Sequence, residues 1–561
     1  MQRTIDCLFI GHNDINFADY EKSIRGMGCH SGAYRDLNLN FIRCNDKPYT
    51  ASEIFNLFYC SNKNGKSSRK PLLTGDTFSA AIAYLGTYLH RRGFSFDYVN
   101  SFQEEKEELV EKLRQENILT IAVITTLYTS VLPILEIMEV IRKNNRTAKI
   151  ILGGPFIHTQ VRILSQVSLE YLFGTTIGAD YYVDSSQGEA ALTAIISSLK
   201  NNKPLSSIPN IYYKNNGGYL ATPKVRENNP LKENMVNWDL FSPSVGEVVN
   251  VRTSISCPFS CSFCGFPERA GKHQTVPARL IIRQLKSLET IYTVKMVNFI
   301  DDTFNVPGER FKELLGMMIK HRTRLPWTSN FRCQFADRET VSLMKESGCE
   351  GVFLGIESGN NQILKNMNKR ALVEKYLEGI ALLKEFEILT MGSFIIGFPG
   401  ETYETIQDTL GFIKESNIDF FQVQLWYCEP ITPIWEQKDK YNLEGESFEW
   451  SHKTMDSKLA SHRVEEIFLS VETPIYVPQY HFDYTKIWFL KHRGITLDQV
   501  KDFLRAFNRG IKQKLTEPAK PEIDIEVIKQ LKDALRQDHD VENFFNERTD
   551  ALTTDDIQFN F

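Results

Sequence analysis

Strong net charge, long apolar runs and a disulfide framework are all missing from this chain of 561 residues. A formal net charge of −5 offers no basic surface to a polyanion, so nucleic acid is not an expected partner. No apolar run is long enough to span a bilayer, and no signal-peptide core follows Met1, so we expect a cytoplasmic protein without membrane contact. The cysteines outside residues 257–264 are scattered, which indicates thiols in a reducing compartment.

Three closely spaced cysteines are the most informative feature that is present. Cys257, Cys261 and Cys264 follow a C-x3-C-x2-C pattern. Thiolates are soft ligands that suit zinc, copper(I) or an iron–sulfur cluster. A closed zinc site normally has a fourth ligand, often from a second Cys or His pair, and no such pair follows here. The pattern therefore favours a cluster with one open iron, with zinc or three buried structural cysteines as the alternatives.

This cysteine pattern, with Phe263 just before the last cysteine, resembles the signature of the radical S-adenosylmethionine (SAM) superfamily. The resemblance implies that Cys257, Cys261 and Cys264 hold a 4Fe–4S cluster whose open iron binds SAM. Reductive cleavage of SAM would then release a 5′-deoxyadenosyl radical that abstracts hydrogen from a substrate. It also implies that Phe263 lies along the adenine, whereas Phe263 could instead be a core residue.

Apolar strands alternate with amphipathic helices over residues 5–200, a pattern typical of a parallel, doubly wound sheet. Gly153-Gly154-Pro155 and Gly178-Ala179-Asp180, with Gly188-Glu189 further on, make this stretch similar to the cobalamin-binding domain that often precedes a radical SAM core. The Asp-x-His-x-x-Gly loop that supplies a cobalt ligand in some relatives is absent. A Rossmann-like sheet that no longer holds cobalamin is the alternative.

A second domain begins at the strand that precedes the cysteines. Six strand candidates separated by helical stretches predict a parallel sheet curled into a partial barrel. Residues 441–561 contain helical segments and no second cysteine cluster, so we expect a helical cap. The predicted fold is α/β, with a Rossmann-like cobalamin-binding-type domain at residues 1–222, a linker at 223–248, a barrel of six β/α units at 249–440 and the cap at 441–561.

Polar and small residues follow the predicted strands, where the chemistry of such barrels is found. By resemblance to the superfamily, these residues would contact SAM; they are Asp301, Asp302, Glu357, Ser358, Gly397 and Gly400. Each also has a structural interpretation. The aspartates could cap a helix, Glu357 could pair with a buried arginine, and the glycines could simply form a strand and a turn.

Cys428 follows the sixth predicted strand, beside Trp426 and Tyr427. A lone cysteine is most often a small buried hydrophobe. At this position, however, it would face the place where SAM and substrate meet, and a thiol S–H is weak enough to donate hydrogen to a carbon radical. We therefore predict Cys428 as a catalytic hydrogen donor, with buried packing as the alternative.

The segments Gly32–Leu37 and Leu425–Pro430 make most of the chain similar to the phosphinothricin P-methyltransferase-like proteins, a group that includes peptide epimerases of the proteusin class. An epimerase needs a thiol donor, whereas a methyltransferase needs cobalamin in the first domain. Because Cys428 lies where a donor should, the sequence favours L-to-D epimerisation of a ribosomal precursor peptide. A cobalamin-dependent methyltransferase acting on carbon or phosphorus is the alternative. A SAM- or cobalamin-binding regulator would not need an open-iron cluster. An external electron donor of flavodoxin or ferredoxin type is implied.

Overall fold

A computed structural model describes residues 3–60, 69–215 and 217–535 of the chain. The chain divides into two compact units, one formed by Met1–Tyr34 with Thr74–Pro474 and one formed by Arg35–Leu73 with Ile475–Phe561. The first unit contains two parallel sheets in succession. Within the described ranges, no helix is both long and apolar enough to cross a bilayer.

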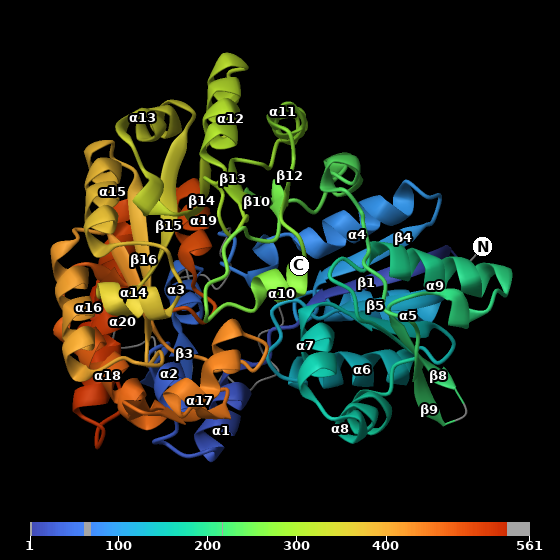
Figure 1. Cartoon of the computed structure of the whole chain (residues 1–561), viewed down its shortest axis with the longest axis horizontal. Helices are drawn as coiled ribbons and strands as arrows, with labels where there is room; N and C mark the ends of the chain where they lie inside the picture. Colours follow the sequence, from blue (N-terminus) through green and yellow to red (C-terminus); the bar gives the residue numbers. More distant parts are fainter. Residues whose placement is uncertain (1–2, 61–68, 216, 536–561) are drawn as a thin grey trace. The chain divides into compact units, whose positions relative to one another are not determined.

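The first sheet carries the doubly wound pattern that the sequence predicts (Figure 1, blue to teal). Its strands are β1 (Thr4–His12), β4 (Phe96–Ser101), β5 (Asn117–Ile124), β6 (Lys149–Gly153) and β7 (Tyr181–Val183), followed by the hairpin β8 (Ile211–Asn215) and β9 (Gly218–Ala221). Its helices are α4 (Ala80–His90), α5 (Lys106–Gln115), α6 (Leu132–Asn144), α7 (Pro155–Ile163), α8 (Gln166–Tyr171) and α9 (Glu189–Asn201).

Strand order explains where this sheet can take a ligand. The order is β4-β1-β5-β6-β7-β8-β9, and the pairs from β4 to β7 are parallel. β4 therefore lies on one side of β1 and β5 on the other, so the direction of winding reverses at β1. Open sheets of this kind bind ligands at the carboxyl ends of the strands beside such a reversal. Residues such as Leu8 and Ile121 are completely buried, because both faces of β1 and β5 are covered by helices.

The second sheet of this unit contains six parallel strands in chain order, the predicted partial barrel. They are β10 (Val248–Val251), β13 (Met296–Phe299), β14 (Trp327–Phe331), β15 (Cys349–Glu357), β16 (Leu389–Ile396) and β17 (Phe420–Leu425). The helices between them are α10 (Phe266–Ala270), α11 (Ala278–Leu288), α12 (Gly308–Lys320), α13 (Arg338–Glu346), α14 (Asn361–Asn366), α15 (Val373–Glu385) and α16 (Tyr403–Glu415). A two-stranded ladder of β11 (Ser254–Ile255) and β12 (Gln274–Thr275) flanks the cysteine loop.

Three short antiparallel strands follow the barrel. They are β18 (Glu444–Glu446), β19 (Glu449–His452) and β20 (Met455–Asp456), between α17 (Lys438–Tyr441) and α18 (Ser457–Ser470). Trp450 of β19 is buried, and its indole N–H donates to the Trp426 carbonyl at 2.9 Å. These strands therefore cover the chain where it leaves β17.

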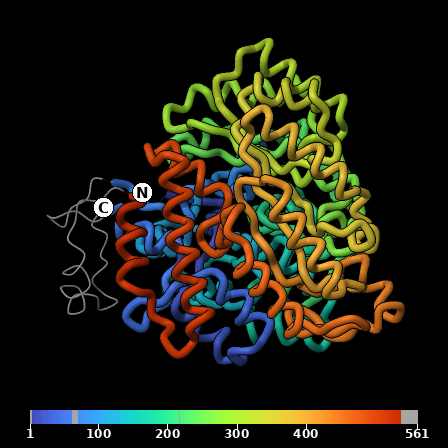
Figure 2. The backbone as a smooth tube through the Cα atoms, turned by 90° about the vertical axis from the view of Figure 1, so that its left-hand side faces the viewer, coloured from blue at the N-terminus to red at the C-terminus, as the bar shows by residue number. Residues whose placement is uncertain are grey.

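The second unit joins two segments that are far apart in the sequence. It contains the hairpin β2 (Phe41–Cys44) and β3 (Lys47–Thr50), helix α3 (Ala51–Tyr59), and helices α19 (Tyr484–His492), α20 (Leu497–Thr516) and α21 (Ile525–Ala534). Figure 2 shows α20 and α21, in red, running side by side. Lys514 Nζ donates to the Asn38 and Phe41 carbonyls at 2.8 and 2.6 Å. Residues 35–60 and 69–73 thus fold with the C-terminal helices, and this compact unit resumes at Ile475.

Candidate functional site

The cysteine loop is attached to the second sheet through Asp301. This aspartate follows β13 and is completely enclosed, and its carboxylate accepts from the backbone N–H groups of Thr253 and Ser254 at 2.8 and 2.6 Å. The two hydroxyls add bonds of 2.5 and 2.9 Å. Burial raises the pKa of Asp301 even though these donors favour the ionised form. All the donors come from the strand that leads into the cysteines, so Asp301 holds that strand in place.

The three cysteines lie near one another without converging on a single point. Within the described residues, no three His, Cys, Asp or Glu side chains converge as the ligands of one metal ion would. Burial, with smaller contributions from the nearby Cys261, Asp302 and Cys257, raises the pKa of the Cys264 thiol to about 12. A 4Fe–4S cluster binds each thiolate to a different iron and supplies the positive charge that ionises them. Three close thiols that share no single centre therefore fit a cluster better than a zinc ion.

Two polar side chains contact the cysteine sulfurs directly. Arg332 Nη2 lies 3.3 Å from Cys261 Sγ, and its guanidinium stacks over the Phe259 ring at 3.6 Å. Thr303 Oγ1 lies 3.3 Å from Cys257 Sγ. Hydrogen bonds to sulfur tune the reduction potential of an iron–sulfur cluster. Neither residue was expected from the sequence, because both come from loops distant in the chain.

Phe263 and Glu357 meet across the side chain of Lys369. The Lys369 ammonium lies 2.7 Å from Glu357 Oε1, with both groups buried, and 5.7 Å from the centre of the Phe263 ring. Glu357 has a φ of 68°, a left-handed conformation that is rare for glutamate and common at functional sites. Glu357 does pair with a buried cation, but that cation is a lysine rather than an arginine.

The remaining predicted SAM residues of β15 and β16 lie in closely packed surroundings. The Ser358 hydroxyl is buried 3.3 Å from Thr409 Oγ1. Gly397 and Gly400 have φ values of 96° and 98°, so both positions require glycine. A Cβ on Gly397 would lie 2.6 Å from the Trp450 ring. The Glu401 carboxylate accepts from the Gly397 N–H at 2.5 Å, and burial raises its pKa to about 8.

Cys428 lies just beyond β17, as predicted, but its thiol is enclosed. It is 1% exposed, and its backbone N–H and carbonyl both bond to Ser447 of the loop between β18 and β19. The thiol lies 3.8 Å from the Gly445 carbonyl. Burial raises the pKa of the thiol to about 12. These contacts match the packing alternative rather than a donor that faces a cofactor.

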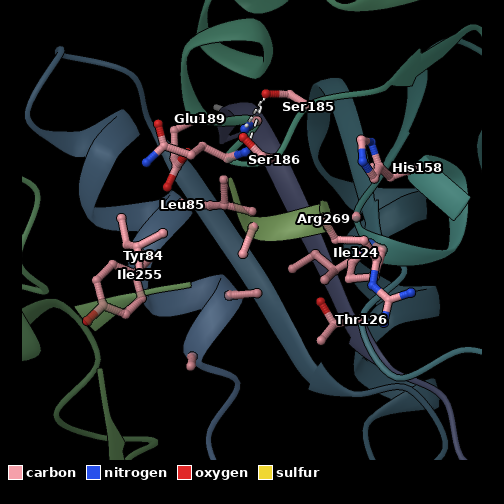
Figure 3. A pocket seen from close by; sticks show the side chains of 18 of the residues that line it. Tyr84, Leu85, Ile124, Thr126, His158, Ser185, Ser186, Glu189, Ile255 and Arg269 are labelled. Carbon is pink, nitrogen blue, oxygen red and sulfur yellow. Dashed lines mark hydrogen bonds between the residues drawn. The ribbon is translucent and has the colours of Figure 1, made fainter. Parts of the chain in front are cut away.

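A cavity of about 520 Å³ lies between the first sheet and the cysteine loop. Figure 3 shows side chains of both domains around this space, with Tyr84, His158 and Glu189 from the first and Ile255 and Arg269 from the second. Asp302, next to the loop-anchoring Asp301, also lines it, and burial raises the pKa of Asp302 to about 7. Of the predicted site residues, Asp301 and Asp302 line this cavity; the cysteines, Phe263, Glu357, Ser358, Gly397, Gly400 and Cys428 do not.

The chemistry of the cavity wall suits a large, mainly apolar ligand with a few polar groups. Ala122, Ile124 and Ile151 form its floor at the carboxyl ends of β5 and β6. Leu127 is 79% exposed and has a φ of 72°, so a strained turn holds an apolar side chain in the open. Buried Nε atoms of Arg252 and His158 have no hydrogen-bond partner. An organic cofactor would cover such a leucine and bond to such nitrogens, so the wall fits cobalamin.

Sequence reasoning missed Arg252 and His158 as cavity residues, whereas Glu189 belongs to the segment that resembled a cobalamin-binding domain. Arg252 stacks over the Tyr84 ring at 4.3 Å, which brings the barrel against α4. Burial raises the pKa of Glu189 to about 7, although the positive charge of the nearby Arg252 acts in the opposite direction. The Gly153-Gly154-Pro155 turn was the signal that could have drawn attention to His158, three residues further on.

Comparison with known proteins matches both domains. The radical SAM superfamily matches residues 251–413, and the B12-binding domain matches residues 73–172. An uncharacterized methyltransferase of Pyrococcus horikoshii is 29% identical over 268 residues, 46% of this chain and 58% of that protein. The bacteriochlorophyllide d C-12(1)-methyltransferase of Chlorobaculum tepidum is 29% identical over 238 residues, 41% of this chain and 52% of that protein. The chain thus spans little more than half the length of these two curated relatives.

Solved structures share the arrangement of both domains. The methyltransferase TsrM of Kitasatospora setae, with cobalamin and a 4Fe–4S cluster bound, has a TM-score of 0.60 at 17% identity, covering 80% of this chain and 98% of that one. The cobalamin-dependent radical enzyme OxsB, with aqua-cobalamin and SAM bound, has a TM-score of 0.55 at 13% identity, covering 98% and 81%. At these identities the likeness concerns the fold.

The chain therefore carries a B12-binding domain followed by a radical SAM domain, in the fold of cobalamin-dependent radical SAM enzymes. A radical SAM domain implies a 4Fe–4S cluster and SAM, and a B12-binding domain supports cobalamin as a further cofactor. The predicted recognition, fold class and cofactors are confirmed at this level. The relatives named above favour the methyltransferase alternative, and they do not support peptide epimerisation.

Proposed function

We propose that this protein is a cobalamin-dependent radical SAM methyltransferase that acts on carbon or phosphorus of a small-molecule substrate. The observation that carries the proposal is the shared cavity, whose wall runs from the B12-binding sheet to Asp302 beside the cysteine loop. A methyl group that passes between SAM, cobalamin and a substrate needs such a meeting point. The methyltransferases among the relatives support the same assignment.

In this proposal Cys257, Cys261 and Cys264 hold the cluster. When bound, the cluster supplies the electron that cleaves SAM, and cobalamin supplies the carrier for the methyl group. Arg332 places a positive charge beside Cys261. This charge offsets the negative charge of the thiolates, and it eases electron entry because the reduced cluster carries one more negative charge.

Further residues of the barrel are assigned to SAM as part of the proposal. The Asp302 carboxylate accepts a hydrogen bond from the SAM amino group, because Asp302 lines the cavity next to the cysteine loop. Asp301 acts as a positioning residue for that loop. Phe263 lies along the adenine. The Lys369 ammonium, which pairs with Glu357, lies over the Phe263 ring. Ser358, Gly397 and Gly400 keep their predicted place in the SAM-binding segments.

A cytoplasmic location and electron supply from a flavodoxin or ferredoxin type of protein belong to the same proposal. The sequence-predicted peptide substrate remains compatible with it, since a peptide also offers carbon for methylation. Cys428 has no role in methyl transfer, which agrees with its enclosed thiol.

An acceptor-independent experiment tests the proposal. The full chain is reconstituted anaerobically with iron and sulfide, then incubated with SAM and a low-potential reductant, with and without cobalamin. We expect 5′-deoxyadenosine in both samples, together with S-adenosylhomocysteine that forms only when cobalamin is present. Liquid chromatography with mass spectrometry measures both products.

Two outcomes would contradict methyl transfer. One is 5′-deoxyadenosine release with no cobalamin-dependent S-adenosylhomocysteine. The other is incorporation of one deuterium per modified residue when a precursor peptide is turned over in D2O, which would restore the epimerase. The Cys257/Cys261/Cys264 triple alanine variant is the control for radical chemistry and should release no 5′-deoxyadenosine.

A further inference from the structure

His158, in the wall of the shared cavity, forms a buried hydrogen-bonded pair with Asp184. It lies in the first turn of α7, directly after the Gly153-Gly154 turn that ends β6, and is 4% exposed. Its Nδ1 atom lies 2.5 Å from Asp184 Oδ1. Lys224 pairs with the other oxygen of the same carboxylate. The imidazole is therefore held in one orientation by two neighbours.

This arrangement sets what the second ring nitrogen can do. Burial opposes ionisation of Asp184, but bonds from His158 and Lys224 outweigh it and lower the pKa of that carboxyl. An ionised carboxylate at Nδ1 keeps a proton on that nitrogen, so Nε2 on the opposite side of the ring is presented to a ligand. That Nε2 atom is buried without a hydrogen-bond partner, while the residue lines the cavity.

The backbone next to His158 is suited to the same kind of ligand. No side chain caps the N-terminus of α7, so backbone N–H groups of its first turn have no side-chain acceptor. Gly154 has a φ of 121°, and a Cβ there would lie 2.9 Å from Thr125 Oγ1. A glycine turn that leads into a helix N-terminus, after a parallel strand, is where open α/β sheets hold the phosphate of a nucleotide.

We propose that His158 Nε2 accepts a hydrogen bond from a ribose hydroxyl in the nucleotide tail of cobalamin, rather than contacting the corrin ring or the cobalt. The inference rests on the cobalamin binding that the proposed function also requires. An oriented histidine could equally serve as a metal ligand. Its place in the first turn of a helix, beside a glycine turn of the nucleotide-binding type, points to the tail.

Binding of two ligands to the full chain tests this assignment. Cobalamin carries the nucleotide tail, and cobinamide has the same corrin without it. Affinities are measured from visible absorbance changes, without SAM or substrate. In the His158→Ala variant we expect cobalamin affinity to fall about tenfold, the effect of one lost hydrogen bond that leaves a buried group unpaired. Cobinamide affinity should stay unchanged.

Two further substitutions separate the nitrogen atoms. Asparagine places its amide near the position of Nδ1, so His158→Asn can keep the Asp184 contact but lacks Nε2. Glutamine reaches toward the position of Nε2. We expect His158→Asn to bind cobalamin as weakly as the alanine variant, and His158→Gln to recover part of the affinity. His273→Ala is the matched control, because His273 also has a buried, unpartnered Nε2 but does not line the cavity.

Three results would overturn the inference. Equal losses for cobalamin and cobinamide would place the contact on the corrin or in the fold. Unchanged cobalamin affinity in His158→Ala would remove the contact altogether. Nitrogen splitting in the electron paramagnetic resonance spectrum of bound cob(II)alamin that disappears in His158→Ala would make His158 a cobalt ligand. In each case the wild-type protein still binds cobalamin, so the proposed function is not contradicted. A wild-type protein that binds neither cobalamin nor cobinamide would contradict the inference about His158 and the proposed function together.

Discussion

The strand ends of the barrel differ sharply between its two sides. Beyond β10 and β13, Arg252 and residues 254–256 and 300–302 line the shared cavity, and we call these the open strand ends. Beyond β16 and β17, Gly397 and residues 426–428 lie against β18, β19 and the loop between them, and we call these the covered strand ends. His452 of β19 bonds to the Gly397 carbonyl at 3.0 Å, and Ser447 bonds to Cys428.

The difference shows why residues of one type take unlike roles. Both aspartates at the open ends line the cavity, but Asp301 is buried and its carboxylate accepts from four donors, whereas Asp302 is exposed. A cysteine at the covered ends is packed, whereas Cys257 and Cys264 are only partly buried. Exposure to a ligand, rather than residue type, separates a chemical group from a structural one.

The largest expected effect contrasts the cysteines of the two sides. Replacing Cys257, Cys261 and Cys264 together with alanine should abolish bound iron and 5′-deoxyadenosine formation, because no thiolates remain to hold the cluster. Cys428→Ala should retain both. Iron analysis and product chromatography are the measurements. Normal iron content in the triple variant would show that the three loop cysteines do not hold the cluster. Loss of bound iron in Cys428→Ala would show that Cys428 is more than a packed core residue.

Neighbouring aspartates should differ in their contribution to stability. Asp301→Ala removes the carboxylate, so the buried backbone N–H groups of Thr253 and Ser254 lose their acceptor. We expect a loss of about 2–4 kcal/mol in the free energy of unfolding. Asp302→Ala, the control, should cause no such loss, because the raised pKa of Asp302 shows that the fold already disfavours its ionised carboxylate. Urea denaturation measures both, and equal losses would show that Asp301 does not anchor the loop.

The covered ends should be intolerant of added volume. Gly397→Ala places a Cβ 2.6 Å from the Trp450 ring at a φ of 96°. The clash and the strained backbone should together cost about 2–4 kcal/mol of unfolding free energy. Gly411→Ala is the matched control, because a Cβ there meets nothing within 4 Å in the interior of α16. Gly411→Ala should raise the free energy of unfolding by up to about 1 kcal/mol. A similar loss of unfolding free energy in Gly397→Ala and Gly411→Ala would argue against close packing at the covered ends.

The smallest expected effect is a pH dependence at the cavity. Burial raises the pKa of Glu189 from 4.5 to about 7, so between these values the folded protein holds a proton that the unfolded chain has released. Stability from this group therefore falls as pH rises through that window. Glu189→Gln should lose less stability than the parent between pH 5 and pH 8, by on the order of 2 kcal/mol.

Thermal denaturation of the cofactor-free protein at the two pH values measures this difference. Glu385→Gln is the control, because Arg338 lowers the pKa of that exposed carboxyl and its titration has the opposite sign. An unchanged pH slope in Glu189→Gln would mean that Glu189 is ionised in the folded protein at pH 5.

Much of the architecture could be predicted because its signals are local. The parallel strands of both sheets are short apolar runs, and the runs that the sequence shows at 119–125, 296–300 and 391–397 coincide with β5, β13 and β16 within a few residues. The segment Arg35–Leu73 had no such pattern. Its partners are helices more than 400 residues further on, as the bond from Lys514 to Asn38 shows, and no window of neighbouring residues contains that information.

The sequence by itself determined the cysteine loop, because three thiols within eight residues need no distant partner to come together. It also determined the order of the two domains, since strand and helix periods are properties of short segments. Only the tertiary structure decided which strand ends are open. It joined His158, Asp184 and Lys224 in one wall and enclosed Cys428 against residues 445–447. These outcomes depend on contacts between residues distant in the chain, which packing of the whole fold selects and sequence spacing does not encode.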